Sequence, residues 1–223
     1  MRMRLAIRAL IKYLAGLILV GILLFVPAGS FRYFEGWLFI GLLFVPMLLL
    51  GMVLLFRSPE LLQKRLESKE EEKTQKGVLG VFAFLFVAGF ILAGLDYRFD
   101  WSRFPPIIPK IGSVFLLVSY ALYAEVIREN TYLSRTIHVQ DGQRVIDTGL
   151  YALVRHPMYT VTLLLFLSFA VVLNSLWTLF CFLLFIPLFV IRILNEEKVL
   201  LKDLQGYASY REKVKYRLIP FIW

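Results

Sequence analysis

A short polar motif, Arg155-His156-Pro157-Met158-Tyr159, stands directly before a long apolar stretch. Proline is favoured at the first position of a helix, because its missing N–H would have no intrahelical partner there and its backbone is already helical. A helix that begins at Pro157 would direct free N–H groups and the positive end of its dipole toward an anion, beside the fixed charge of Arg155. The alternative is that this motif only anchors a membrane helix at the lipid headgroups.

A second polar motif follows the same apolar stretch. Arg192 and Glu196 are four residues apart and share a helix face, whereas Glu197 points about 100° away. A plain exposed ion pair between the first two would contribute only ~0.3–0.5 kcal/mol. Residues 156–191 carry no formal charge, which is too long for one membrane helix and just enough for two. With a turn at Asn174-Ser175, a hairpin would return both polar motifs to the same membrane face.

The composition predicts a chain embedded in a lipid bilayer. Its 223 residues are 59% hydrophobic and 18% charged, with a mean hydropathy of +0.72, whereas soluble domains have ~45–50% apolar and ~25% charged residues. The 25 Lys+Arg exceed the 16 Asp+Glu, but they lie between the apolar blocks, so we expect them to orient the chain and not to bind nucleic acid. Cys181 is the only cysteine, which excludes a disulfide framework and a Cys/His zinc site, and we expect no metal.

Long apolar blocks predict an all-α, polytopic membrane bundle of about six transmembrane helices in a single membrane domain, residues 1–223. Residues 1–129 would hold spans one to four, and residues 130–223 a loop, the tight hairpin of spans five and six, and a cytosolic C-terminal helix. Between spans two and three, Ser58 and Pro59 predict a short helix that begins at the proline. The first four spans are expected at Tyr13–Phe31, Gly36–Phe56, Gly77–Leu95 and Ile111–Ile127.

The distribution of basic residues predicts the orientation of the chain. In the six-span arrangement, 21 of the 25 Lys and Arg residues fall on one side, which is typical of the cytoplasmic side, so both termini are expected there. An alternative interpretation takes residues 1–28 as a cleaved signal peptide, although the charge-free segment is longer than a usual signal core of ~7–15 residues. No eukaryotic type of targeting signal is seen, so we expect a prokaryotic plasma membrane; an endoplasmic-reticulum location stays open.

Six motifs follow one another in the second half of the chain: Asn130-Thr131-Tyr132-Leu133 with Gln140, Val145 through Tyr151, Arg155 through Tyr159, Arg192 through Glu197, Gly206-Tyr207 with Tyr210, and Arg217-Leu218-Ile219-Pro220. In this order they resemble the motifs of the isoprenylcysteine carboxyl methyltransferase family, whose wider group includes the phospholipid N-methyltransferases. The resemblance covers roughly residues 130–223, and the first three spans match only in hydropathy. Leu150 departs from the pattern, since many members carry proline before the tyrosine.

The resemblance implies an integral membrane enzyme that uses S-adenosyl-L-methionine, releases S-adenosyl-L-homocysteine and has no Rossmann domain. Residues 130–223 would then be its catalytic region, with the cofactor in a pocket that faces the cytosol. Arg192 would bind the methyl acceptor and, with Glu196, act in catalysis. The implied cofactor contacts are Gln140, Gln143, Arg144, Val145, Ile146, Tyr151, His156, Pro157, Met158, Tyr159 and Glu196.

The expected reaction is methyl transfer to a lipophilic acceptor from the bilayer, most simply carboxyl O-methylation of an isoprenylcysteine-like substrate. Methyl transfer from a sulfonium needs alignment and a dry site more than a strong acid or base. An arginine near the acceptor favours a carboxylate. N-methylation of a phospholipid headgroup or S-methylation of a small thiol on the same scaffold are the alternatives. A non-catalytic transporter or assembly factor is the alternative of another class, and the oligomeric state is left open.

Three further polar features need an interpretation. Glu125, at the inner end of span four, has Arg128 three residues away as a partner. His138 is most simply a loop residue. A tail helix could close over the cofactor as a lid or rest on anionic headgroups as an anchor; it is expected to carry Tyr207, Tyr210 and Arg217.

Overall fold

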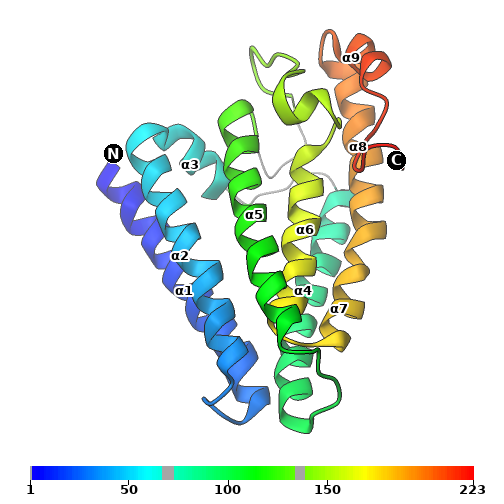
Figure 1. Ribbon diagram of the computed structural model, residues 1–223. Coiled ribbons are helices and arrows are strands. Elements are labelled where there is room, and N and C mark those ends of the chain that lie inside the picture. Colours follow the sequence, from blue (N-terminus) through cyan, green and yellow to red (C-terminus); the bar gives the residue numbers. More distant parts are fainter. Residues whose placement is uncertain (1, 67–72, 134–138) are drawn as a thin grey trace.

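The computed structural model describes residues 2–66, 73–133 and 139–223. Secondary structure in these ranges is entirely helical, which confirms the all-α prediction. In Figure 1 the helices lie side by side as a bundle, and both ends of the chain lie toward its upper end. The helices are α1 (Arg2–Ala28), α2 (Phe34–Arg57), α3 (Pro59–Leu66), α4 (Lys73–Phe99), α5 (Ile107–Glu129), α6 (Pro157–Val172), α7 (Leu176–Leu183), α8 (Phe185–Asp203) and α9 (Tyr207–Lys213), with a 3₁₀ turn at Gly149–Ala152.

Five helical segments of the described chain are long and apolar enough to cross a membrane: α1, α2, Gly77–Phe99, α5 and Leu176–Asp203. α6 is apolar but has only 16 residues, so it is the short member of the six predicted spans. The first span differs from its prediction, since α1 begins at Arg2 and ends at Ala28. Gly29 follows with a positive φ of 63°, which stops the helix.

The hairpin turn lies where it was predicted. Asn174 has a positive φ of 59°, and the Ser175 hydroxyl caps α7 by accepting a hydrogen bond from the Thr178 N–H. The first arm is α6, 16 residues long, and the second arm, α7 and α8 together, spans Leu176–Asp203, 28 residues. Helical structure thus continues past the apolar stretch and carries the second polar motif. α3 begins at Pro59 as predicted, whereas His138 lies outside the described residues.

A buried carboxylate fixes this turn to the far end of the bundle. Asp96, 1% exposed, accepts hydrogen bonds from the backbone N–H and hydroxyl of Ser102 at 2.8 and 2.6 Å and from the Ser175 hydroxyl at 2.6 Å. The Tyr33 hydroxyl donates to the Leu173 carbonyl at 2.6 Å. These contacts satisfy the buried polar groups and hold α6 and α7 in register with α2 and α4.

Aromatic side chains fill the centre of the bundle, and apolar side chains also cover its outside. The central rings come from five helices, and each is no more than 2% exposed: Phe39, Phe90, Phe169, Phe182 and Phe185. Large apolar side chains at the surface include Ile18, Val45, Phe84, Val114 and Phe180, each at least half exposed. An apolar exterior of this extent suits contact with lipid tails, where helix association depends on close packing.

Gly89 lets α4 lie directly against the ring of Phe182 on α7. A Cβ at this position would lie 2.1 Å from Cε1 of Phe182, so alanine at Gly89 cannot fit without moving the ring. We expect Gly89→Ala to lower the free energy of unfolding by ~1–3 kcal/mol, against the usual gain of ~1 kcal/mol from glycine to alanine in a helix. Thermal unfolding in detergent measures this. Gly41→Ala, where the Cβ would meet nothing within 4 Å, is the control, and equal melting temperatures for both variants would contradict the expectation.

Candidate functional site

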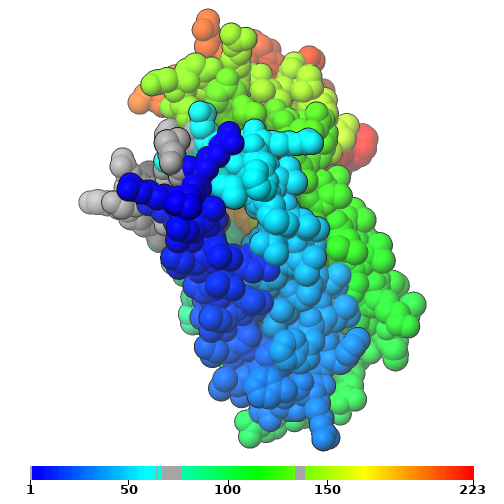
Figure 2. All heavy atoms as spheres, turned by 90° about the vertical axis from the view of Figure 1, so that its left-hand side faces the viewer, coloured from blue at the N-terminus to red at the C-terminus, as the bar shows by residue number. Residues whose placement is uncertain are grey.

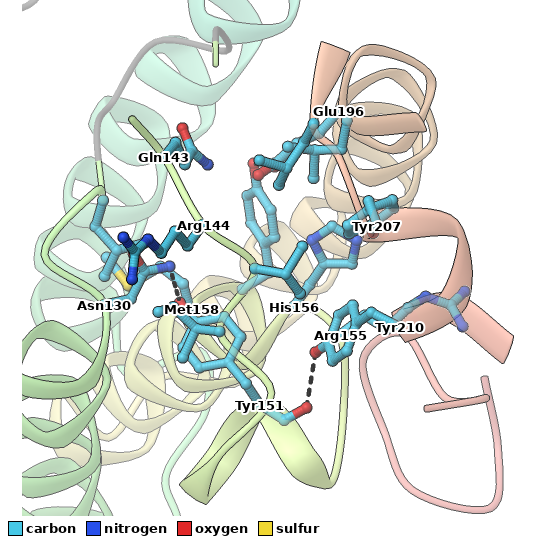
Figure 3. A pocket seen from close by; sticks show the side chains of 16 residues that line it. Asn130, Gln143, Arg144, Tyr151, Arg155, His156, Met158, Glu196, Tyr207 and Tyr210 are labelled. Carbon is cyan, nitrogen blue, oxygen red and sulfur yellow. Dashed lines mark hydrogen bonds between the residues drawn. The ribbon is translucent and has the colours of Figure 1, made fainter. Parts of the chain in front are cut away.

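A cavity at the upper end of the bundle collects most of the residues that the sequence singled out (Figure 3). Nine of the predicted cofactor contacts line this first cavity. Gln140 does not, and lies in a neighbouring hollow that it shares with Gln143; Pro157 is instead the first residue of α6. The first cavity is lined by Asn130, Leu133, Gln143, Arg144, Val145, Ile146, Tyr151, Arg155, His156, Met158, Tyr159, Glu196, Leu200, Leu204, Tyr207 and Tyr210.

Asn130 and Tyr210 hold Tyr151 from both sides, and neither was a predicted cofactor contact. The Asn130 side-chain amide donates to the Tyr151 hydroxyl at 2.9 Å, and the Tyr210 hydroxyl donates to the Tyr151 carbonyl at 2.7 Å (Figure 3). The Glu129 carboxylate accepts the Leu150 N–H at 3.0 Å. Burial raises the pKa of Tyr151 above its ordinary value, so its hydroxyl stays protonated and available as a donor.

Arg155 forms a buried ion pair rather than facing an anion alone. Its Nε lies 2.7 Å from Oε1 of Glu197, and the side chains are 3% and 5% exposed. The Nη1 group of Arg155 donates to the carbonyls of Val214 and Lys215 at 2.7 and 2.9 Å. Arg155 thereby ties the start of α6 to α8 and to the segment after α9.

The segment after α9 runs along the start of α6. The backbone N–H groups of Arg155 and His156 donate to the carbonyls of Tyr216 and Arg217, both at 2.9 Å. Arg217 was expected on the tail helix, and this was wrong: α9 ends at Lys213, and Arg217 instead donates from Nε to Glu197 at 2.9 Å. A residue on a continuing helix could not make this backbone pairing, because its carbonyl would be used within the helix.

α9 itself closes one side of the first cavity. Tyr207 and Tyr210 are 3% and 5% exposed, and both line the cavity. Burial raises the pKa of both hydroxyls above the ordinary value, so they too are protonated donors. This position fits the lid interpretation of the tail helix.

The second polar motif meets the first through a tyrosine. The Tyr159 hydroxyl donates to Oε2 of Glu196 at 2.6 Å and accepts from Nε of Arg192 at 2.9 Å. Arg192 is only 8% exposed. The predicted hairpin therefore brings the two motifs into direct contact, with one hydroxyl between the guanidinium and the carboxylate.

A comparison with family models identifies the segment that holds this arrangement. Residues 111–206 match the model of the phospholipid methyltransferase family. This segment of the chain is similar to that family. The wider group includes the isoprenylcysteine carboxyl methyltransferases, so the resemblance is confirmed. A comparison with curated proteins returned no match.

The protein has a second, mostly apolar cavity of about 560 Å³ beside the first. This volume is typical of small-molecule sites, which span ~300–1,000 Å³. Leu133, Met158, Tyr159 and Glu196 line both cavities. In Figure 2 the surface is hollowed between α1 and α2, just below α3. The remaining lining residues of the second cavity are Met47, Leu50, Arg65, Leu79, Phe82, Tyr120, Tyr123, Thr162, Leu165, Phe166, Phe189 and Arg192.

Two buried polar atoms have no hydrogen-bond partner in the described part of the chain: Nε2 of His156 and the hydroxyl of Tyr207. Nε2 of His156 lies 3.4 Å from Oε1 of Glu197. Both residues line the first cavity. Because buried polar groups in native proteins are nearly always paired, these two atoms are suited to hydrogen-bond a polar ligand or a water molecule in this cavity.

Proposed function

We propose that this membrane methyltransferase transfers a methyl group from S-adenosyl-L-methionine to the carboxylate of a lipophilic, isoprenylcysteine-like acceptor. One observation carries the proposal: a cavity rich in polar groups and a mostly apolar cavity meet at Tyr159 and Glu196. A polar methyl donor in the first cavity and a lipid-soluble acceptor in the second could therefore meet where the two cavities join.

The residues of the first cavity fit the proposed cofactor. The unpaired His156 nitrogen and Tyr207 hydroxyl suit its polar groups, Glu196 suits an ammonium or ribose hydroxyls, and Val145 and Tyr151 suit an adenine ring. The cavity holds about 80 Å³, so binding requires lining side chains to move outward, and the exposed Arg144 is the easiest to displace. When bound, the cofactor supplies an electrophilic methyl group on a sulfonium.

The chain's own residues would align the two reactants and exclude water from them. Arg192 would hold the acceptor carboxylate through its forked N–H groups, and the Tyr159 hydroxyl keeps the Nε side of the guanidinium in place. The apolar walls of the second cavity exclude water from the acceptor. Holding two reactants close to attack geometry accounts for ~7–11 kcal/mol of the barrier in favourable cases.

N-methylation of a phospholipid headgroup is the second candidate, and the description of the matched family favours it. An amine acceptor would approach the carboxylate of Glu196, which lines both cavities, instead of the guanidinium of Arg192. The two candidates thus differ in the residue that the acceptor contacts: Arg192 for a carboxylate and Glu196 for an amine.

Arg192→Ala separates acceptor binding from cofactor binding. We expect calorimetry with S-adenosylhomocysteine to give an unchanged Kd, because Arg192 lines only the second cavity. Transfer of labelled methyl to an N-acetylated farnesylcysteine should lose about 100-fold in kcat/KM, since truncating one partner of a buried charged contact costs ~2–5 kcal/mol. Arg57→Ala, at the exposed end of α2, is the matched control.

Two results would contradict this proposal. A well-folded wild-type protein that does not bind S-adenosylhomocysteine would exclude the methyltransferase function and favour a transporter or assembly factor. Transfer of methyl to phosphatidylethanolamine but not to the farnesylcysteine would replace carboxyl methylation by the phospholipid candidate.

A further inference from the structure

The segment after α9 folds into a closed loop at residues 217–223. Three consecutive backbone N–H groups, those of residues 217–219, donate to the main-chain oxygen of Trp223 at 2.9 to 3.2 Å. The Arg217 guanidinium carbon lies 5.1 Å from the centroid of the Trp223 ring, and Phe221 has a positive φ of 66° at the turn. These contacts give the 217–223 loop a defined shape although it belongs to no helix.

One side of the 217–223 loop packs against the bundle. Leu218 is 3% exposed and belongs to the apolar cluster at the centre of the bundle, and Trp223 packs against that cluster. The Thr160 hydroxyl, on the first turn of α6, donates to the Leu218 carbonyl at 2.6 Å. In Figure 1 the end of the chain lies beside α8, below α9 and close to the height of α3. The loop therefore lies where the apolar helix α6 begins, between the spans and the polar upper end of the bundle.

The other side of the loop presents two adjacent large apolar side chains. Phe221 is 87% exposed, the largest fraction among the large apolar residues of the described chain, and Ile222 is 76% exposed. Apolar residues that are exposed singly are ordinary on a protein surface. A turn that already packs through Leu218 and Trp223 has no need of two more apolar side chains if its outer side faces water.

The charges beside the loop match the surface of a bilayer. Residues 207–223 contain four basic residues and one acidic residue. Arg211 and Lys215 are exposed, and Lys215 directly precedes the turn. Apolar side chains next to basic ones bind at a membrane surface, because the first enter the boundary of the acyl chains and the second attract lipid phosphates. Since α6 begins at the same level, the loop is continuous with the lipid-facing exterior of the bundle.

We propose that the 217–223 loop is a membrane anchor, in which Phe221 and Ile222 insert at the headgroup layer while Lys215 contacts lipid phosphates. The anchor role considered for the tail then belongs to this loop, whereas α9 closes the first cavity. This inference does not depend on the proposed function, because neither a cofactor nor a methyl acceptor enters it.

The anchor reaches the first cavity through the main chain. The carbonyls of Tyr216 and Arg217 accept the N–H groups of Arg155 and His156, both at 2.9 Å. Arg155 and His156 line the first cavity. A loop held at the bilayer surface keeps these two hydrogen bonds formed, so contact with lipid would stabilise this wall of the cavity.

Spin labels on the full-length protein measure the insertion directly. Cys181, the only cysteine, is replaced by alanine, and single labels are attached through Phe221→Cys, Ile222→Cys or Ser209→Cys. Ser209 is exposed on α9 and serves as the control. In nanodiscs of phosphatidylcholine and phosphatidylglycerol, we expect the labels at 221 and 222 to be accessible to oxygen, which concentrates in lipid, and protected from a water-soluble nickel complex. The label at 209 should show the reverse.

Hydrogen exchange in the same nanodiscs tests the link to the cavity. The double variant Phe221→Ser with Ile222→Ser should speed exchange of the Arg155 and His156 amides about tenfold, because local opening exposes their hydrogen bonds. Phe34→Ser, which removes a 69% exposed ring at the start of α2, should leave this exchange unchanged.

Three results would contradict the proposal. Access of the nickel complex to the labels at both 221 and 222, as at 209, would overturn the anchor. Spin–spin broadening between labelled copies, without access to oxygen, would assign these side chains to a contact between two copies of the chain instead. Inserted labels with unchanged exchange in the double serine variant would overturn the link to the cavity and keep the anchor.

Discussion

Replacing Glu196 with alanine is expected to weaken binding of S-adenosylhomocysteine by at least about 100-fold and to abolish methyl transfer. Glu196 lines both cavities and accepts the Tyr159 hydroxyl at 2.6 Å. Its removal would take away the proposed acidic partner of the cofactor and leave the Tyr159 hydroxyl without its acceptor, and a lost charged contact in a buried site costs ~2–5 kcal/mol. Calorimetry in detergent gives the Kd directly.

Two controls accompany this variant. Glu196→Gln keeps the size of the side chain and one acceptor oxygen, so we expect a Kd between those of the wild type and Glu196→Ala. Glu212→Ala removes an exposed carboxylate from α9 and should bind like the wild type. Wild-type affinity in Glu196→Ala, with normal thermal unfolding, would rule out Glu196 as a cofactor contact.

Replacing Glu197 with alanine is expected to destabilise the protein more than any surface change. The carboxylate accepts from Arg155 at 2.7 Å and from Arg217 at 2.9 Å, and the Arg155 side chain is 3% exposed. Removing one partner of a buried ion pair costs ~3–5 kcal/mol, because a charge is left buried alone. For a chain of this size the melting temperature should fall by roughly 6–20 °C.

An exposed pair of the same type is the control for Glu197→Ala. Glu125 and Arg128 pair at 2.6 Å, with side chains 39% and 70% exposed, and Glu125→Ala should melt close to the wild-type temperature because solvent screens this pair. The double variant Arg155→Met with Glu197→Leu should lose less than Glu197→Ala, because no charge remains buried. A Glu197→Ala protein that melts at the wild-type temperature would show that the ion pair has no stabilising role.

Local signals in the sequence were enough for much of the fold and part of the site. Proline at the start of a helix placed the first residue of α6 at Pro157, and a polar pair inside a charge-free stretch placed the turn at Asn174. The spacing of Arg192 and Glu196 correctly put them on one helix face. Each of these signals acts within a few residues of the structure that it determines.

Contacts between distant segments were not visible in the sequence. Glu197 was correctly expected to point away from Glu196, but its partner Arg155 is 42 residues earlier, and nothing local indicates this pairing. Arg155 was accordingly given a role beside an anion. The place of Arg65 in the second cavity likewise depends on how α3 packs, which no local pattern in the sequence indicates.

The link between Arg155 and the segment after α9 has a consequence for the order of events during biosynthesis. The carbonyls that Arg155 binds belong to residues 59 and 60 positions later, and a chain is made and inserted from its N-terminus. All the membrane spans therefore leave the ribosome before the contacts of Arg155 and His156 with residues 214–217 exist. A nascent chain that is halted before these residues emerge would lack the segment that pairs with the start of α6, so the wall of the first cavity is completed only at the end of synthesis.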